Sequence, residues 1–222
     1  MTFKAIIFDM DGVIVDTEPL QFARQKEYLQ HLGVAIPEET LMEMVGGNKK
    51  MTFQIISNYY KEEISFKEYY KRFAAYYADR PIDFTEILNE GVIETLEWLK
   101  AQGYRLALAS SGAPEKIEAA LTQCKIKDYF ELILSGDMFK ASKPHPEIYQ
   151  TVAQKMRLAP EECLVIEDSN YGIESATRAG MYTLAKREER FPFSQEQADG
   201  LFDSFSVVIA FLENQDLKAA NQ

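Results

Sequence analysis

Phe8-Asp9-Met10-Asp11-Gly12-Val13 follows directly on the apolar run that begins at Ala5. Four apolar residues before turn-forming Asp and Gly are typical of a short strand buried on both faces, as in a parallel sheet. Asp9 and Asp11 start from the same side of an extended backbone, and Gly12 allows the sharp bend that brings both carboxylates around one small volume. Such a pair needs a cation, a proton or both. The stretch alone also fits a strand that simply ends in a polar turn.

The composition is that of an ordinary globular protein. The chain has 222 residues, 46% hydrophobic and 27% charged, which suits one large domain or one domain with an insertion. A net charge of -11 argues against nucleic acid as a partner, because that affinity comes largely from Lys and Arg. Cys124 and Cys163 lack metal-ligand spacing and are expected to be buried free thiols. We recognise no signal peptide and no membrane span, and expect a cytoplasmic protein.

Residues 15–87 have a helical pattern without a convincing strand. Helices are predicted over residues 20–32, 37–45, 51–60 and 66–78. In the last of these, aromatic residues recur at spacings of three and four, namely Phe66, Tyr69, Tyr70, Phe73, Tyr76 and Tyr77. Such a face could stack on a sugar ring, but aromatic faces usually supply core area, so we predict that it packs inside a small helical domain.

After residue 83 the pattern changes to strands that alternate with helices, as in a parallel sheet with crossover helices. Strands are predicted over residues 105–109, 132–134, 163–166 and 181–184, with a possible edge strand over 198–202. Helices are predicted over residues 91–102, 114–123, 146–156 and 172–179, with a last helix that ends at Glu213. The sequence therefore predicts an α/β fold with a doubly wound parallel sheet.

Polar side chains follow four segments of this predicted sheet. In doubly wound sheets the functional groups gather at the carboxyl ends of the strands. The residues expected there are Asp9, Asp11, Ser110, Ser111, Lys143, Glu167 and Asp168. Each has an ordinary explanation by itself, such as a helix cap or a solvated lysine. Their occurrence together and in this order indicates a common site.

The chain closely resembles the haloacid dehalogenase-like superfamily, and within it the β-phosphoglucomutase-like phosphatases. The resemblance covers nearly the whole chain and rests on residues 8–18, on Ser142-Lys143-Pro144-His145-Pro146 and on residues 166–173. It implies a Rossmann-like core formed by residues 1–14 and 88–222. The helical stretch of residues 15–87 is then a cap domain inserted after the first strand.

The resemblance also implies roles for the site residues. Asp9 would be the nucleophile that forms an aspartyl phosphate, and Asp11 would be the general acid and base. Magnesium would be held by the Asp9 carboxylate, the Asp11 main-chain carbonyl and Asp168. Glu167 would orient a water molecule that is bound to the metal, rather than bind the metal directly. The remaining phosphate oxygens would be bound by Ser110, Ser111 and Lys143.

The expected activity is magnesium-dependent hydrolysis of a small phosphate monoester, such as a sugar phosphate. A phosphosugar mutase of the β-phosphoglucomutase type is the alternative, although Gln21 stands where that enzyme has a His. Dehalogenases and phosphonate hydrolases of the superfamily lack a second carboxylate at the position of Asp11. A phosphorylated signalling receiver carries its acidic pair on the first strand, which is the reverse of the order found here.

The cap is expected to set specificity, as it does in the family. Gly46-Gly47-Asn48-Lys49-Lys50 fits either a solvated helix start or a substrate loop, and these two interpretations stay open. Lys50 and Gln21 are the candidate substrate contacts on the cap. A lid hinged near residues 14–17 and 80–87 could close over the metal site. The sequence names no particular metabolite and leaves the oligomeric state open.

Overall fold

The computed structural model describes residues 2–45, 49–61 and 63–220. Within these ranges a single parallel sheet has the strand order β3-β2-β1-β4-β5-β6. The strands are β1 (Ala5–Phe8), β2 (Arg105–Ser110), β3 (Leu132–Ser135), β4 (Cys163–Glu167), β5 (Tyr182–Lys186) and β6 (Gly200–Phe202). The order reverses direction between β1 and β4, and ligands of doubly wound sheets bind beside such a switch point. The predicted α/β fold is confirmed.

The first strand lies in the centre of the sheet. It pairs in parallel with β2 on one side and with β4 on the other, and Ile7 is aligned with Ala107 and Val165. All four residues of β1 are completely buried. This burial explains why the strand is a continuous apolar run rather than an alternating one.

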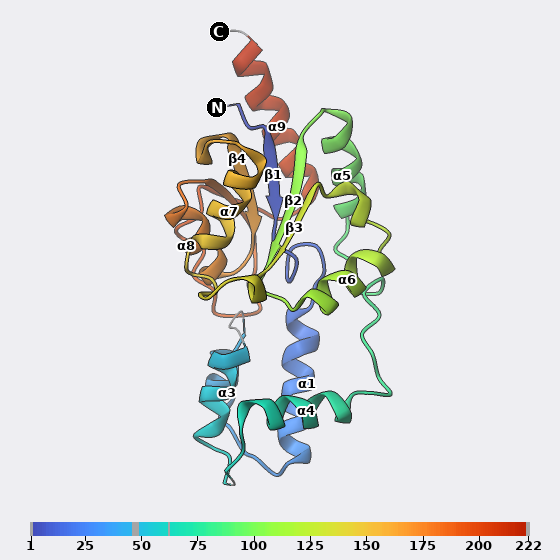
Figure 1. Cartoon of the computed structure of the whole chain (residues 1–222), viewed down its shortest axis with the longest axis vertical. Helices are drawn as coiled ribbons and strands as arrows, with labels where there is room; N and C mark the ends of the chain where they lie inside the picture. Colours follow the sequence, from blue (N-terminus) through green and yellow to red (C-terminus); the bar gives the residue numbers. More distant parts are fainter. Residues whose placement is uncertain (1, 46–48, 62, 221–222) are drawn as a thin grey trace.

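Helices cover both faces of the sheet (Figure 1). One face packs against α5 (Val92–Ala101), α6 (Pro114–Gln123) and α9 (Phe205–Ala220). The other face packs against α7 (Glu147–Met156) and α8 (Asn170–Arg178). Short 3₁₀ helices span Lys127–Tyr129, Gly136–Met138 and Pro160–Glu162. No helix in the described part of the chain combines the length and apolar character that crossing a membrane requires.

Four helices lie together beyond the carboxyl ends of the strands, at the bottom of Figure 1. They are α1 (Glu18–His31), α2 (Glu38–Met42), α3 (Lys49–Ser57) and α4 (Phe66–Tyr76). They have a core of their own, in which Tyr69 is completely buried and Tyr28 contacts Tyr69 and Phe73 edge to face. The aromatic face of α4 therefore supplies core area, as predicted. We refer to residues 15–87 as the cap, a domain boundary that stays a prediction.

Two linkers join the cap to the sheet, and they lie side by side. Val15 forms an isolated antiparallel bridge with Leu88. The amide of Asp16 donates to the carbonyl of Ile87 (2.7 Å), and the amide of Asn89 donates to the carbonyl of Ile14 (2.9 Å). The chain therefore enters and leaves the cap through one narrow place.

Most elements begin and end within a few residues of their predicted bounds, but the last helix does not. It was expected to end at Glu213 and continues to Ala220. Val208 and Leu212 anchor its first turns in the core. The following segment Leu217-Lys218-Ala219-Ala220 consists of residues with high helix propensity, which favours continuation of the helix.

Candidate active site

The first strand places Asp9 at its carboxyl end, where the amide of Asp9 still donates to the carbonyl of Ile166 on β4 (2.9 Å). The chain then turns back in a tight loop, in which the amide of Gly12 donates to the carbonyl of Val15 (2.7 Å). Gly12 has a φ of +81°, and a Cβ at this position would lie 1.9 Å from Oδ2 of Asp168. Glycine is therefore required both for the bend and for the close approach to Asp168.

Lys143 ties the ends of three strands together. Its ammonium nitrogen lies 2.6 Å from Oδ1 of Asp9 and 2.7 Å from Oε1 of Glu167, and it also donates to the carbonyl of Ala109 on β2 (2.9 Å). Asp9 and Lys143 are each 7% exposed and Glu167 is not exposed at all, so solvent hardly screens these contacts. The predicted residues Asp9, Lys143, Glu167 and Asp168 are thus brought together.

Glu167 is held by donors on both of its carboxylate oxygens. Oε1 accepts from Lys143 and from the hydroxyl of Tyr149 (2.9 Å), and Oε2 accepts from the amides of Asp168 (2.9 Å) and Ser169 (3.2 Å) and from the Ser169 hydroxyl (3.2 Å). The ring of Tyr149 also faces the Lys143 ammonium at 4.8 Å. Most of the acceptor capacity of Glu167 is therefore used within the protein, which suits a supporting role better than that of a direct ligand.

Burial makes the ionised forms in this cluster costly. It acts together with the nearby carboxylates of Glu167 and Asp11 to raise the pKa of Asp9 to about 8, although Lys143 opposes the shift. Burial and the charges of Glu167 and Asp9 likewise raise the pKa of Asp168. Burial disfavours the Lys143 ammonium, but the charges of Asp9 and Glu167 outweigh this effect and raise the pKa of Lys143. Lys143 is therefore held as a cation, but its single positive charge does not offset the cost of burying the neighbouring carboxylates.

The three buried carboxylates of Asp9, Glu167 and Asp168 offer oxygens that lie within 4.8 Å of one another. One ammonium, that of Lys143, faces them, so the ionised cluster carries two negative charges in excess. A divalent cation would neutralise them. Oxygen-only donors suit a hard cation such as Mg²⁺. The residues present therefore fit the metal ion that the sequence predicts.

The carboxylate of Asp11 does not belong to this cluster. Its Oδ1 accepts from the hydroxyl of Thr17 (2.5 Å) and from the ammonium of Lys116 on α6 (2.6 Å). Thr17, which contacts Asp11, is the N-cap residue of α1, the first helix of the cap domain. The side chain of Asp11 is thus poised between the core and the cap, next to the cluster but paired separately.

The two predicted serines differ in their environment. Ser110 ends β2 and is completely buried, and its hydroxyl accepts from the amide of Gly112 (3.0 Å). Ser111 follows the strand and is exposed. Both precede α6, whose N-cap residue Ala113 makes no side-chain cap hydrogen bond. Binding of phosphate oxygens by Ser110 and Ser111 stays a prediction.

The two candidate contacts on the cap are both exposed residues of helices. Gln21 is exposed on α1, and Lys50 is exposed near the start of α3. The predicted loop residues Gly46, Gly47 and Asn48 lie outside the described residues. Lys49 is exposed as well, and its ammonium lies 5.4 Å from the centre of the Tyr70 ring. The roles of Gln21 and Lys50 stay predictions.

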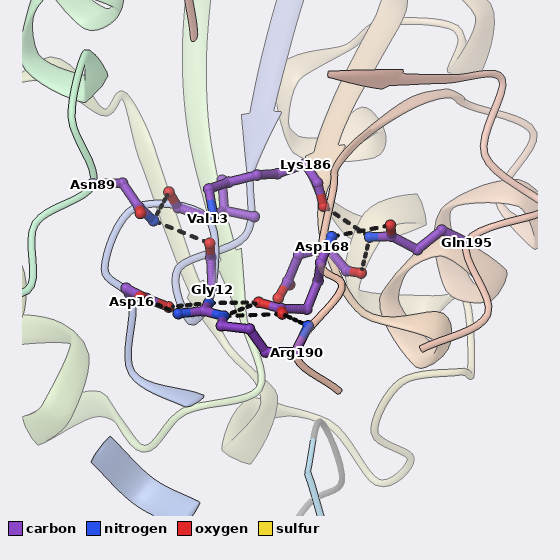
Figure 2. Close-up of polar contacts among 9 residues, drawn as sticks. Gly12, Val13, Asp16, Asn89, Asp168, Lys186, Arg190 and Gln195 are labelled. Atoms are coloured by element: carbon purple, nitrogen blue, oxygen red, sulfur yellow. Dashed lines mark hydrogen bonds and ion pairs between the residues drawn. The ribbon is translucent and has the colours of Figure 1, made fainter. Parts of the chain in front are cut away.

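Sequence reasoning missed several residues that support the site. Tyr149 contacts Glu167, and Lys116 contacts Asp11. Asn89 contacts the loop after β1, where it donates to the carbonyls of Gly12 (3.0 Å) and Val13 (2.7 Å) (Figure 2). All three lie far in the sequence from the residues that they contact. Tyr149 lies five residues after the Ser142–Lys143–Pro144 motif in an apolar helix face, so it was indistinguishable from core. Lys116 had the pattern of a solvated helix residue.

Comparison with known proteins gives a consistent result. Residues 6–186 match the family described as haloacid dehalogenase-like hydrolase. A phosphorylated carbohydrates phosphatase from Thermotoga maritima is 33% identical over 180 residues, which cover 80% of this chain and 82% of the relative. A predicted phosphoglycolate phosphatase from Haemophilus somnus has a TM-score of 0.80 at 28% identity, covering 95% of this chain and 98% of that one. A β-phosphoglucomutase from Clostridium difficile shares the fold, with a TM-score of 0.78 at 22% identity and complete coverage of both chains.

Proposed function

Because this chain belongs to the haloacid dehalogenase-like hydrolases, we propose that it is a magnesium-dependent phosphatase that hydrolyses a small phosphate monoester through an aspartyl phosphate on Asp9. The observation that carries the proposal is the buried cluster at the ends of β1 and β4. In it the Asp9 carboxylate lies 2.6 Å from the Lys143 ammonium, and three carboxylates leave two negative charges in excess. A phosphate monoester brings further negative charge, so its binding here requires a further cation in addition to the Lys143 ammonium that faces Asp9.

In the first step an oxygen of Asp9 forms a bond to phosphorus while the bond from phosphorus to the ester oxygen breaks. The ester oxygen takes a proton from Asp11 and leaves as an alcohol. In the second step water attacks phosphorus, Asp11 accepts a proton from that water, and the bond between Asp9 and phosphorus breaks. Inorganic phosphate and the original carboxylate of Asp9 result. Lys143 stays protonated throughout and stabilises the charge on the transferred group.

Asp9 and Asp168 are the side chains that would hold the magnesium ion, with Glu167 behind them and the main chain of Asp11 beside them. When bound, Mg²⁺ would supply charge neutralisation at the phosphoryl oxygens. The residues Ser110 and Ser111 would bind the oxygens of the phosphoryl group that face β2. We further propose that the protein is located in the reducing cytoplasm, because its two cysteines, Cys124 and Cys163, are buried free thiols.

The substrate we propose is a small phosphorylated metabolite of the sugar phosphate class. The names of the relatives support this class, since one acts on phosphorylated carbohydrates and another is named for phosphoglycolate. The acidic composition argues against nucleic acid. A mutase activity is the alternative, and the glutamine at position 21 favours transfer to water because β-phosphoglucomutase has a His there.

A panel of phosphate esters tests the proposal. Release of inorganic phosphate is measured with Mg²⁺ and with a chelator, and glucose 1-phosphate is assayed in parallel for isomerisation to glucose 6-phosphate. We expect hydrolysis of at least one sugar phosphate that depends on Mg²⁺, and an acid-stable, hydroxylamine-labile phosphoenzyme after rapid quenching. Isomerisation that outpaces phosphate release would favour the mutase. Metal-independent turnover without a phosphoenzyme would overturn both.

A further inference from the structure

The loop between β5 and β6, residues 187–199, passes the end of the sheet at which Asp168 lies (Figure 2). Its residue Gln195 uses both ends of its side-chain amide. The nitrogen donates to the main-chain carbonyls of Asp168 (2.6 Å) and Lys186 (2.7 Å), while the oxygen accepts from the amide of Glu188 (3.2 Å). One side chain thus joins the end of β4, the end of β5 and the start of the loop.

This contact fixes Asp168 from the side opposite to β1. On the β1 side, Gly12 lies so close to the Asp168 carboxylate that no Cβ could be accommodated. On the other side, Gln195 holds the Asp168 carbonyl. Asp168 therefore lies between two loops, with its carboxylate against Gly12 and its main-chain carbonyl held by Gln195, which restricts where the carboxylate can point. Such outer contacts orient metal ligands and affect metal affinity.

The same loop is bound to the cap. Arg190 forms two parallel hydrogen bonds to the Asp16 carboxylate, both 2.7 Å long, and contacts the Glu188 carboxylate through Nε (3.0 Å) and Nη2 (2.5 Å). The side chain of Glu188 is only 3% exposed. Hydrogen bonds from Arg190 lower the pKa of Asp16 below its usual range. A bidentate guanidinium that also bridges a buried carboxylate is more rigid than an ordinary surface ion pair.

Asp16 belongs to the first of the two cap linkers, and its amide is bonded to Ile87 in the second. One residue further along the loop, the ring of Phe191 lies 5.9 Å from that of Phe22 on α1. The loop thus contacts the linker and the first helix of the cap. Loop 187–199 reaches Asp168 at one end and the cap at the other, with only four residues between Arg190 and Gln195.

We propose that loop 187–199 couples the metal site to the cap: Gln195 is a positioning residue for Asp168, and Arg190 transmits that position to the linker at Asp16. The coupling rests on the proposed function, because it needs a divalent cation at Asp9 and Asp168. It works in both directions, since two sites that influence each other do so by the same factor. A bound cation therefore restrains the linker, and a released linker weakens cation binding.

The first experiment measures the affinity of the full chain for Mn²⁺, a paramagnetic substitute for Mg²⁺, by electron paramagnetic resonance of the free ion. The variant Gln195→Ala removes all three contacts of the side chain. The control Gln197→Ala removes an exposed glutamine from the same loop. We expect the affinity to fall about tenfold in Gln195→Ala, as for other residues behind metal ligands, and to stay within about twofold in Gln197→Ala. Thermal unfolding of each metal-free variant identifies any general loss of stability.

The second experiment follows hydrogen exchange at the amides of Asp16 and Asn89, which are bonded across the linkers. We expect Mn²⁺ at saturation to slow exchange in the wild type and in Gln197→Ala. In Arg190→Ala the metal still binds, but the slowing at these two amides is lost, because the linker is no longer attached to the loop. A simple loss of local stability would instead raise exchange equally with and without the metal.

The outcomes separate this inference from the proposed function. A wild-type chain that binds no Mn²⁺ would overturn the metal site and the coupling together. Tight Mn²⁺ binding that is the same in the wild type and Gln195→Ala would leave the metal site intact and overturn the role of Gln195. Equal slowing of exchange in the wild type and Arg190→Ala would overturn the transmission to the cap.

Discussion

The ammonium of Lys143 lies 2.6 Å from a carboxylate oxygen of Asp9, although the two residues are 134 positions apart in the sequence. Both are nearly completely buried. A compact point charge fits between Asp9 and Glu167, where the planar fork of an arginine would not. The compact shape of the Lys143 ammonium is therefore needed at this position in addition to its positive charge.

Lys143→Arg is expected to lower turnover by about 10² to 10³, the usual loss when one preorganised group facing the transition state is removed. Charge is conserved, so the loss reports geometry. Steady-state kinetics on the best ester of the panel measures it. The control Lys140→Arg changes an exposed lysine three residues earlier and should leave turnover unchanged. Similar turnover in both variants would contradict a role for the position of the Lys143 charge.

Asp9→Asn is expected to lower turnover by several orders of magnitude, because an amide oxygen cannot replace the carboxylate nucleophile. The variant should also yield no phosphoenzyme after rapid quenching. The control Asp128→Asn alters an exposed carboxylate and should retain both properties. Substantial turnover in a folded Asp9→Asn protein would exclude Asp9 as the nucleophile.

The stability of the metal-free protein is expected to depend on the protonation of Asp9. Its pKa is raised from 3.8 to about 8 on folding, so the folded state binds this proton more tightly than the unfolded state does. Stability from this group is complete below pH 4 or so and is lost as the pH rises toward about 8. Mg²⁺ competes with the proton and should therefore raise the unfolding temperature more at high pH than at low pH.

Thermal unfolding with a chelator and with Mg²⁺, at several pH values between about 5 and 8, measures this dependence. Asp9→Asn removes this titrating carboxyl and with it one proposed ligand, so the Mg²⁺ effect should become smaller and lose the part of its pH dependence that comes from Asp9, while Asp168, whose pKa is also raised, still titrates. A Mg²⁺-induced shift in unfolding temperature that is the same at every pH in the wild type would contradict the prediction.

Gly172→Ala is expected to damage the site through Glu167. A Cβ at position 172 would lie 1.7 Å from Oε1 of Glu167, so the carboxylate must move and its contacts with Lys143 and Tyr149 are lost. Overpacking of this kind costs about 1 to 3 kcal/mol in unfolding free energy, and turnover should fall as well. Chemical unfolding and kinetics measure the two effects.

Gly200→Ala is the matched control for that substitution. Its Cβ would meet only the end of the Leu184 side chain at 2.9 Å, and this flexible group can move. We expect a change within about 1 kcal/mol and normal turnover. Equal losses of activity in the two variants would show that Gly172 acts through general stability rather than through Glu167.

Lys50→Ala is expected to raise the Michaelis constant for the preferred sugar phosphate about tenfold, because one charge-assisted hydrogen bond to the substrate is lost. Hydrolysis of a small aryl phosphate should stay unchanged. The small ester needs only the site at the sheet. Lys49→Ala is the matched control, because Lys49 faces Tyr70 within the cap. If both substrates are affected alike, or neither is, Lys50 does not contact the substrate.

The sequence predicted the sheet and the positions of Asp9, Ser110, Glu167 and Asp168 because the ends of buried parallel strands are local features. An apolar run that stops at a polar residue marks each of them. The contacts of Lys116, Tyr149, Arg190 and Gln195 could not be predicted in this way. Each joins residues that are far apart in the sequence, and which pair meets depends on the orientation of whole helices and loops. The last helix was predicted too short, because the prediction ended it at Glu213 although high-propensity residues follow.

The two linkers of the cap also have a consequence for how this architecture can change. The amide of Asn89 donates to the carbonyl of Ile14, so the two ends of the predicted cap, residues 15–87, lie next to each other. The pairing of β1 with β2 and β4 does not pass through that insertion. A different set of helices could therefore replace this segment without shifting the register of the sheet or the position of Asp9 at the end of β1.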